Sequence, residues 1–214
     1  MTKNDNRYVA LIADAVASRT LAPQARAKLQ TEVRARLGDI NRRWRRAIAA
    51  KFAVTRGDEI EGLLGSAAAV WEIAHWIRLT FAEADWVVAC GRGAITTPLA
   101  PTAPEVDGPC FHAARSALDT AKRDRLIFAF GGFEPAVVAF AGYYSALYWS
   151  WTRRQRQAAS YLRYYADTLG SLKLAQSMAI HPTGLSHLRR RMAWPLVEAG
   201  DNMFRDAIAP GEGS

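Results

Sequence analysis

The order of apolar segments along the chain constrains its fold more than any other sequence feature. In the first 132 residues, short apolar runs typical of strands alternate with longer stretches whose apolar residues recur at helical spacing. The resulting order, strand–helix–strand–strand–helix–strand–helix–strand, is the pattern of a split βαβ sheet whose helices we expect on one face. The expected strands are residues 7–14, 52–55, 59–64, 85–97 and 125–130, and the expected helices are residues 22–51, 66–84 and 110–123.

The pattern changes after Gly131 and Gly132, because everything from Glu134 to Ile208 has helical character. We therefore expect an α+β protein in which an all-α domain follows a ferredoxin-like βαββαβ domain. The predicted parts are a first domain at 1–132, a connecting helix at 133–165 and a helix-turn-helix domain at 166–214.

Composition excludes several classes of protein. Of 214 residues, 50% are hydrophobic and 22% are charged, which excludes a disordered chain. The two cysteines, Cys90 and Cys110, are too few for a disulfide scaffold and have no zinc-ligand spacing, so they indicate reduced thiols and a cytoplasmic protein. The apolar N-terminal run is not expected to be a secretion signal, because Asp14 interrupts it.

Residues 135–151 form a seventeen-residue stretch without a formal charge, at the lower limit of membrane-spanning length. Gly142, Ser145 and the polar atoms of its aromatic rings favour a buried or interface helix, with a membrane span as the lesser alternative. The rings of Tyr143, Tyr144, Tyr148 and Trp149 would then make either a contact between domains or a homodimer interface.

Carboxylates occupy two strand ends in the first domain. Asp14 ends the first predicted strand, and Asp58 and Glu59 lie on the hairpin between the next two. If those strands are neighbours, Asp14 and Asp58 face each other and could hold Mg²⁺ or Mn²⁺ against nucleotide phosphates, as a phosphoryl-transfer palm requires. The alternative is that Asp14 caps a turn and the hairpin carboxylates are simply solvated.

Three ordered blocks carry a family resemblance. YVALIADAVASR, TRGDEIEGLL and GRGAITT…DGPCFHAARSAL resemble the SatD family, over essentially the whole chain. The same blocks are more distantly similar to class III nucleotidyl cyclases and diguanylate-cyclase palms. This similarity implies a palm-type domain that either binds a nucleotide without turnover or acts as a metal-dependent nucleotidyl cyclase or transferase.

The resemblance also implies residue roles. Asp14 and Asp58 correspond to the metal-binding carboxylates, and Arg115 to the arginine that stabilises the transition state. If the protein is an enzyme, these three are its catalytic residues. Where cyclases usually carry an asparagine one turn before that arginine, this chain has Phe111. The expected nucleotide-binding residues are Ser18, Arg19, Gly57 and Glu59.

The segment 171–194 has the apolar pattern of a helix-turn-helix. Leu174 and Met178 would pack on one helix, and Leu185 and Leu188 on a second helix that begins at Pro182. Ala179 replaces the glycine common in the turn, which costs little if its φ angle is negative.

Basic residues gather on this same segment. Residues 150–194 contain eight lysines or arginines and one acid, a local charge of +7 within a formal net charge of +8 for the chain. Base or phosphate contacts are expected from the second helix, with backbone contacts from an upstream helix that carries Arg156 as well. The predicted DNA-binding residues are Thr183, Ser186, His187, Arg189, Arg190, Arg191, Arg153 and Arg154.

Together these features favour a DNA-binding transcriptional regulator whose palm-type domain senses a nucleotide or mediates assembly. A homodimer would suit paired half-sites on DNA. The alternative function is a nucleotidyl cyclase or transferase that uses Asp14 and Asp58 with Mg²⁺ or Mn²⁺.

Overall fold

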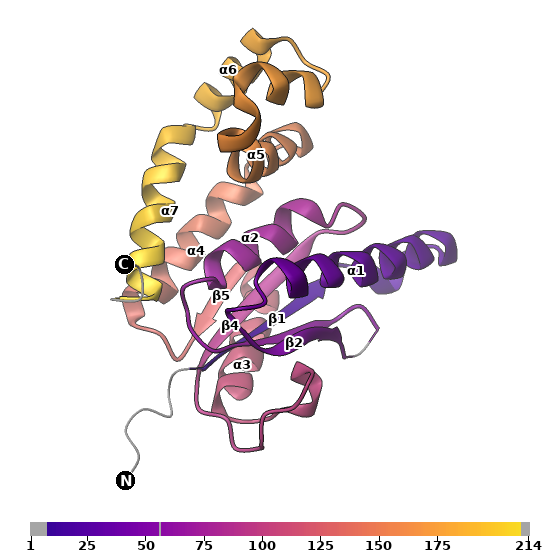
Figure 1. The fold of residues 1–214 in the computed structure, drawn as a ribbon, viewed down its shortest axis with the longest axis vertical. Coiled ribbons are helices and arrows are strands. Elements are labelled where there is room, and N and C mark those ends of the chain that lie inside the picture. The colour runs from indigo at the N-terminus through magenta and orange to yellow at the C-terminus, as the bar shows by residue number, and fades with distance from the viewer. Residues whose placement is uncertain (1–7, 56, 211–214) are drawn as a thin grey trace.

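The computed structural model describes residues 8–55 and 57–210 and shows an α+β protein built on a five-stranded mixed sheet (Figure 1). The strands are β1 (Tyr8–Ala15), β2 (Ile48–Val54), β3 (Ile60–Leu64), β4 (Trp86–Gly93) and β5 (Phe128–Gly131). The helices are α1 (Pro23–Arg43), α2 (Val70–Thr80), α3 (Pro109–Asp124), α4 (Pro135–Trp149), α5 (Arg153–Ser177), α6 (Pro182–Arg191) and α7 (Trp194–Ile208). The predicted alternation of strands and helices is confirmed.

The strand order in the sheet is β2-β3-β1-β4-β5. β1 is antiparallel to both of its neighbours, β3 and β4, whereas β5 runs parallel to β4. As the central strand, β1 is buried along its length except at Asp14, which is half-buried near its carboxyl end. A strand covered on both faces needs this continuous apolar run.

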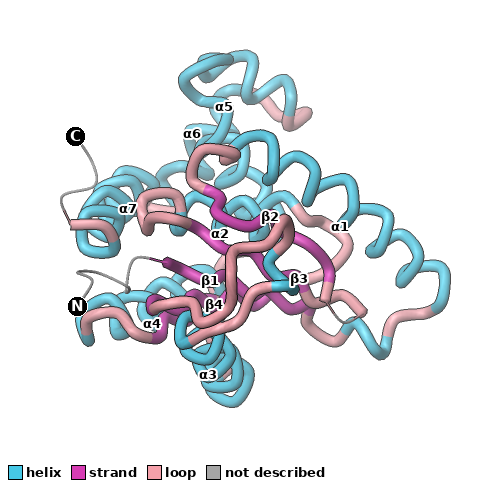
Figure 2. Tube along the Cα trace, turned by 60° about the horizontal axis from the view of Figure 1, so that its bottom comes forward, coloured by secondary structure: helices cyan, strands magenta, loops and turns pink. Residues whose placement is uncertain are grey.

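Helices cover both faces of the sheet, so the expectation of one covered face is wrong (Figure 2). Val9, Leu11 and Ala13 belong to the core beneath α1, α2 and α4, whereas Ala10 and Ile12 face α3. The physical reason is the period of two along β1, which places apolar side chains on both faces and leaves each in need of cover.

The first helix is shorter than predicted. Its periodicity suggested residues 22–51, but α1 ends at Arg43, and Ile48 begins β2 opposite Leu64 of β3. A segment with helical spacing joins the sheet here because strand pairing with β3 satisfies its backbone groups and buries Ala50 and Phe52.

The predicted connecting helix at 133–165 is two helices. α4 ends at Trp149, and α5 begins after Thr152, whose hydroxyl accepts from the backbone N–H of Gln155 in a capping box. Within α4, Tyr144 and Tyr148 are buried inside the chain, whereas Tyr143 is exposed. No helix in the described part of the chain is long and apolar enough to cross a membrane.

The chain reverses direction within α5. Gly170 has φ 66° and ψ 163°, so it divides α5 into two helical pieces, and the second folds back to place the Ser177 carbonyl 3.4 Å from the Tyr161 hydroxyl. Leu174, Met178 and Leu185 are buried, as the apolar pattern predicted, with Leu188 partly buried beside them.

The turn after α5 differs from expectation at Ala179. Its φ angle is +50°, in the left-handed region, whereas a negative angle was the condition for a low cost of alanine there. The Ala179 and Ile180 N–H groups donate to the carbonyls of Gln176 and Ala175, which closes the end of α5. This closure requires a left-handed residue and forces alanine into a strained conformation.

The last helix, α7, runs back along α4 toward the sheet (Figure 1). Its Asp201 is buried, accepts hydrogen bonds from Trp71 Nε1 and the Tyr144 hydroxyl at 2.9 Å each, and pairs with Arg163 of α5. The carboxylate therefore joins α2, α4, α5 and α7. Beside it, Glu72 of α2 accepts from Arg163 at 3.2 Å and from Arg205 at 2.9 Å.

Candidate functional site

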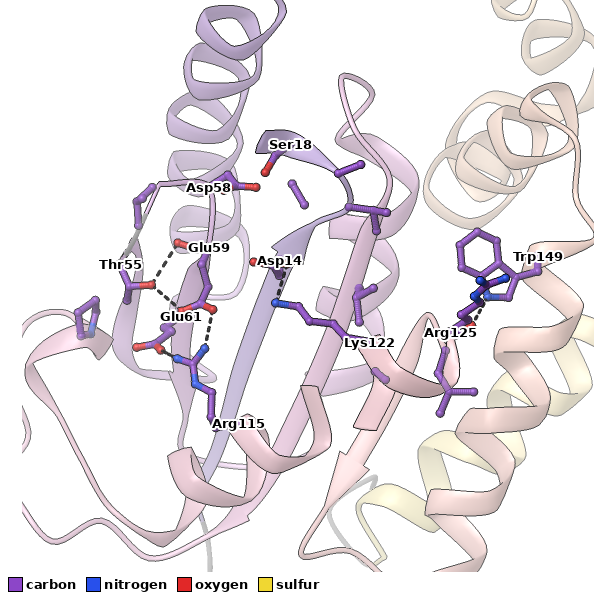
Figure 3. Close-up of a pocket in the computed structure, with 18 residues that line it drawn as sticks. Asp14, Ser18, Thr55, Asp58, Glu59, Glu61, Arg115, Lys122, Arg125 and Trp149 are labelled. Atoms are coloured by element: carbon purple, nitrogen blue, oxygen red, sulfur yellow. Dashed lines mark hydrogen bonds and ion pairs between the residues drawn. The ribbon is translucent and has the colours of Figure 1, made fainter. Parts of the chain in front are cut away.

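An open cleft of about 1370 Å³ lies at one edge of the sheet, where β1 ends and β2 turns into β3 (Figure 3). One side is formed by the β1 end and the β2–β3 hairpin, another by α3, and the far end by the last residue of α4. The side chains that bring polar or aromatic groups to the cleft are Asp14, Ser18, Thr55, Asp58, Glu59, Glu61, Arg115, Lys122, Arg125 and Trp149.

Most residues predicted to form a nucleotide site line this cleft. Asp14, Asp58, Arg115, Ser18 and Glu59 all do so, from three separate segments of the chain.

The other two residues predicted to bind the nucleotide are Gly57 and Arg19. Gly57 lines a smaller neighbouring hollow on the α1 side, together with Asp58, and has a φ angle of +65° that a turn glycine adopts readily. The Arg19 side chain lies outside the described part of the structure.

Asp14 has a basic partner that the sequence did not identify. Its Oδ2 lies 2.8 Å from Lys122 Nζ, and the two side chains are 23% and 45% exposed. Lys122 follows Arg115 by seven residues, which is about two turns, so both cations extend from one side of α3 toward the strand ends (Figure 3). That spacing is a sequence signal for Lys122, but it becomes informative only once α3 is known to face β1.

Arg115 bridges two carboxylates of the hairpin and β3. Its Nη1 lies 2.5 Å from Glu59, and its Nη2 lies 2.5 Å from Glu61. Burial by itself would raise the pKa of Glu59, but the hydrogen bond and charge of Arg115 outweigh it and lower that pKa below its usual value. The guanidinium therefore holds the hairpin against α3.

Asp58 is the carboxylate of the cleft with an unsatisfied atom. Its Oδ2 is buried and has no hydrogen-bond partner among the residues that the structure describes. The hairpin that carries it is closed by the Thr55 N–H, which donates to the Glu59 carbonyl at 2.9 Å. A buried carboxylate oxygen is stabilised by a donor or a cation, so this atom is suited to bind either.

The far end of the cleft is aromatic. Trp149, the last residue of α4, is 46% exposed, and its indole Nε1 donates to the Arg125 carbonyl at 2.6 Å. Arg125 and Leu126 follow α3 and line the cleft beside the ring. Sequence reasoning assigned Trp149 to a domain or dimer contact because nothing local links residue 149 to the strand ends.

The sequence was compared with models of known protein families. The family model described as "SatD family" matches residues 8–126, which is more than half of the chain. The match includes strands β1 to β4 and ends before β5. This chain belongs to the SatD family. A search of curated proteins found no match.

The SatD match covers less of the chain than the sequence blocks suggested. It includes the hairpin, α3 and the β1 end, but stops at residue 126, before Trp149 and the helices α4–α7. The aromatic end of the cleft therefore comes from a part of the chain that the SatD model does not cover.

The helices after the SatD match carry the predicted DNA-binding residues. Thr183, Ser186 and His187 are exposed on α6, as are Arg190 and Arg191, whereas Arg189 is partly buried. Arg153 and Arg154 are exposed at the start of α5, and Arg154 Nη2 lies 3.5 Å from the Met178 carbonyl. That contact brings the start of α5 beside the turn that precedes α6.

Other arginines of this region point inward, which corrects one prediction. Arg156 was expected at a DNA backbone, but it pairs with Asp85, which also accepts from the buried Arg78 at 2.6 Å. Burial would raise the pKa of Asp85, and these two arginines lower it instead. Arg156 and Arg163 thus stabilise the contacts of α5 with Asp85, Glu72 and Asp201. The local charge of +7 is therefore divided between the interior and the surface.

Proposed function

We propose that this protein is a DNA-binding regulator whose SatD-family half is a palm-type domain that binds a nucleotide. The observation that carries the proposal is the convergence of Asp14, Asp58, Arg115 and Lys122 on one cleft at the sheet edge. The strand order supports a palm-type assignment, because β3 lies between β1 and β2 as in a split βαβ unit.

The charges of the cleft suit a phosphate chain with a divalent cation. Lys122 and Arg115 supply the cations that phosphate oxygens prefer, on one side of the cleft. Asp14 and Asp58 supply hard oxygen ligands opposite them. Lys122 is paired with Asp14, and Arg115 with Glu59 and Glu61, so a nucleotide phosphate and its cation would replace these ion pairs.

The carboxylates fit a cation that is shared with the ligand. The described residues contain no cluster of three or more His, Cys, Asp or Glu side chains that could hold a metal ion alone. Within the described residues, the buried Asp58 Oδ2 has no hydrogen-bond partner, and Asp14 is neutralised by Lys122. Phosphate oxygens would complete the coordination of Mg²⁺ or Mn²⁺ and attract Lys122 away from Asp14. When bound, the cation would neutralise phosphate charge.

The cleft is tested by equilibrium binding of the four nucleoside triphosphates with and without Mg²⁺. We expect binding that Mg²⁺ strengthens, and Asp58→Asn should lower the affinity with Mg²⁺ by about tenfold or more, because one charged ligand is lost. Asp167→Asn is the matched control, since Asp167 is exposed on α5 and does not line the cleft. Absence of binding by the wild-type protein would overturn this half of the proposal.

The same reactions distinguish sensing from catalysis. A sensor leaves the triphosphate intact, whereas a nucleotidyl cyclase or transferase releases pyrophosphate in the presence of Mg²⁺ or Mn²⁺. Pyrophosphate release that Asp58→Asn abolishes would establish the enzymatic alternative, with Asp14, Asp58 and Arg115 as its catalytic residues.

The proposal of DNA binding rests on surface arginines that have no acidic partner among the described residues. In the described residues, no acidic side chain forms an ion pair with the α6 arginines at 189–191, or with Arg153. Interior arginines such as Arg163 are paired, so these surface cations remain available for phosphates. The Arg154 contact with the turn places both basic segments near each other.

DNA binding is tested with mixed-sequence duplex DNA at several salt concentrations. Arg190→Ala with Arg191→Ala should weaken the complex and reduce the slope of log affinity against log salt by about 2, if each arginine contacts one phosphate. The control replaces Arg36 and Arg42 of α1, which pair with Asp39, by alanine. An unchanged slope in the α6 variant would exclude α6 as the DNA-binding surface.

A further inference from the structure

We propose that Trp149 is the platform on which the nucleobase stacks, so that α4 completes a site whose phosphate end belongs to the sheet and α3. This inference rests on the proposed nucleotide binding. It assigns the ligand class as a phosphorylated compound with a planar aromatic ring, rather than a phosphate chain alone.

The Trp149 ring is held in place at the cleft. Its Nε1 donates to the Arg125 carbonyl at 2.6 Å, and the guanidinium carbon of Arg78 lies 5.8 Å from the ring centroid. Arg78 is itself fixed by Asp85 and has a side chain only 2% exposed, so it supports the ring from the interior. A tryptophan oriented by two partners loses little conformational freedom when a base binds.

The ring nevertheless keeps much of its surface open. Trp149 is 46% exposed and lines the same cleft as Lys122 and Asp14 (Figure 3). Other aromatic residues of α4, such as Tyr144 and Tyr148, are buried in the core. An indole that is fixed, exposed and part of a cleft wall has the properties of a stacking surface, because every base presents a flat π face.

The size of the cleft agrees with a ligand that has two parts. Its volume of about 1370 Å³ exceeds the roughly 300–1,000 Å³ of common small-molecule pockets. The four carboxylates, Arg115 and Lys122 lie toward the β1 and hairpin end, and the Trp149 ring lies at the other end beside Arg125 (Figure 3). A phosphate chain at one end and a base at the other would use both.

The test compares ATP with inorganic tripolyphosphate, which has the phosphate chain but no base. Trp149→Ala should weaken ATP binding by about 5- to 150-fold, the range of base–aromatic stacking. It should leave tripolyphosphate binding unchanged, whereas Lys122→Ala should weaken both ligands. Trp149→Phe keeps a ring and should restore part of the ATP affinity. Tyr143→Ala is the control, because Tyr143 is 73% exposed on the same helix and does not line the cleft.

A second readout does not depend on affinity. With 5-fluorotryptophan in the protein, the ¹⁹F resonance that disappears in Trp149→Phe identifies residue 149. ATP should shift that resonance, and tripolyphosphate should leave it nearly unchanged. This measurement on the wild-type chain keeps the inference testable if Trp149→Ala does not fold.

The outcomes separate the two proposals. If wild-type protein binds neither ligand, nucleotide binding itself is overturned, and the role of Trp149 with it. If wild-type protein binds both ligands but Trp149→Ala leaves ATP affinity and the ATP/tripolyphosphate ratio unchanged, only the stacking role is overturned. The stacking role is also overturned if ATP does not move the Trp149 resonance.

Discussion

Arginines at the two sides of the C-terminal helices behave in opposite ways. On the inner side, Arg163 has a side chain 4% exposed and pairs with Asp201 and Glu72. On the outer side, Arg190 and Arg191 are exposed, and no described acidic side chain pairs with either. Arginine therefore stabilises an interface between helices on the inner side. On the outer side it leaves net positive charge at the surface.

The difference teaches how a local charge excess should be interpreted. A buried arginine must be paired, because an unpaired charge in the protein interior costs several kcal/mol. A surface arginine has no such requirement, since water solvates it. The +7 of residues 150–194 is therefore a mixture, and only its exposed members support a hypothesis about polyanions.

The largest expected effect comes from removing the buried Asp201 carboxylate on the inner side. Asp201→Ala removes one of the two acidic partners of Arg163 and leaves Trp71 Nε1 and the Tyr144 hydroxyl without this acceptor. Removing one partner of a buried pair costs about 3–5 kcal/mol in the free energy of unfolding. Urea denaturation followed by circular dichroism measures it.

The matched control for that experiment lies on the same helix. Asp206 of α7 is exposed, so Asp206→Ala should change the free energy of unfolding by no more than about 0.5 kcal/mol. A similarly small effect of Asp201→Ala would show that the inner pair contributes no more than a surface charge, which removes the contrast between the two sides.

An effect of intermediate size is the pH dependence of stability that His75 contributes on the inner side. His75 is fully buried, its Nδ1 lies 2.9 Å from the Trp71 carbonyl, and its Nε2 has no partner in the described structure. Burial, together with the nearby charges of Arg163 and Arg205, lowers the pKa of His75 well below its usual 6.5. The folded protein therefore keeps this ring neutral at a pH where the unfolded chain protonates it.

The sign of the pH dependence follows from that depressed pKa. Stability from His75 is fully present above about pH 6.5 and is lost as the pH falls, by up to about 1.4 kcal/mol per pH unit. Denaturation from pH 7 to 5 should show this slope, and His75→Phe should remove it. Burial raises the pKa of Asp201, which contributes the opposite sign, and the difference between the two profiles cancels that contribution. An unaltered slope in His75→Phe would contradict the assignment.

The smallest expected effect concerns the turn that presents the outer side. Ala179 has a φ angle of +50°, which costs an L-residue about 1–2 kcal/mol, so glycine is favoured there. Part of that gain is offset by the greater freedom of glycine in the unfolded chain, and Ala179→Gly should stabilise the protein by up to about 1 kcal/mol.

Thermal or urea unfolding measures the Ala179→Gly effect. Ala199→Gly is the control, because residue 199 is an exposed position inside α7, where glycine should destabilise by about 0.5–1 kcal/mol. Equal destabilisation by both substitutions would contradict a strained turn.

Much of the candidate site was predictable because it depends on local order. A strand that ends in Asp14, followed by a hairpin that carries Asp58, places two carboxylates at one sheet edge once the hairpin pairs with that strand. The apolar positions of 171–194 were likewise predictable, because helical spacing alone decides which side chains face inward. Leu174, Met178 and Leu185 are buried as that spacing predicted.

The rest depends on contacts between distant segments. Lys122 pairs with Asp14 across 108 positions of the sequence only because α3 packs on the face of β1 opposite to α1 and α2. Trp149 reaches the cleft only because α4 packs on β5. Periodicity specifies which side of an element is apolar but not which element will cover it.

By itself, the sequence determined the order of strands and helices, the two carboxylates at the sheet edge and the segment where positive charge collects. The tertiary structure decided that both faces of the sheet are covered, that Ile48 belongs to a strand, and that Arg156 and Arg163 face inward. The physical reason is that local patterns encode burial and backbone preference over a few turns, whereas the partner of each charge is set by the packing of remote elements.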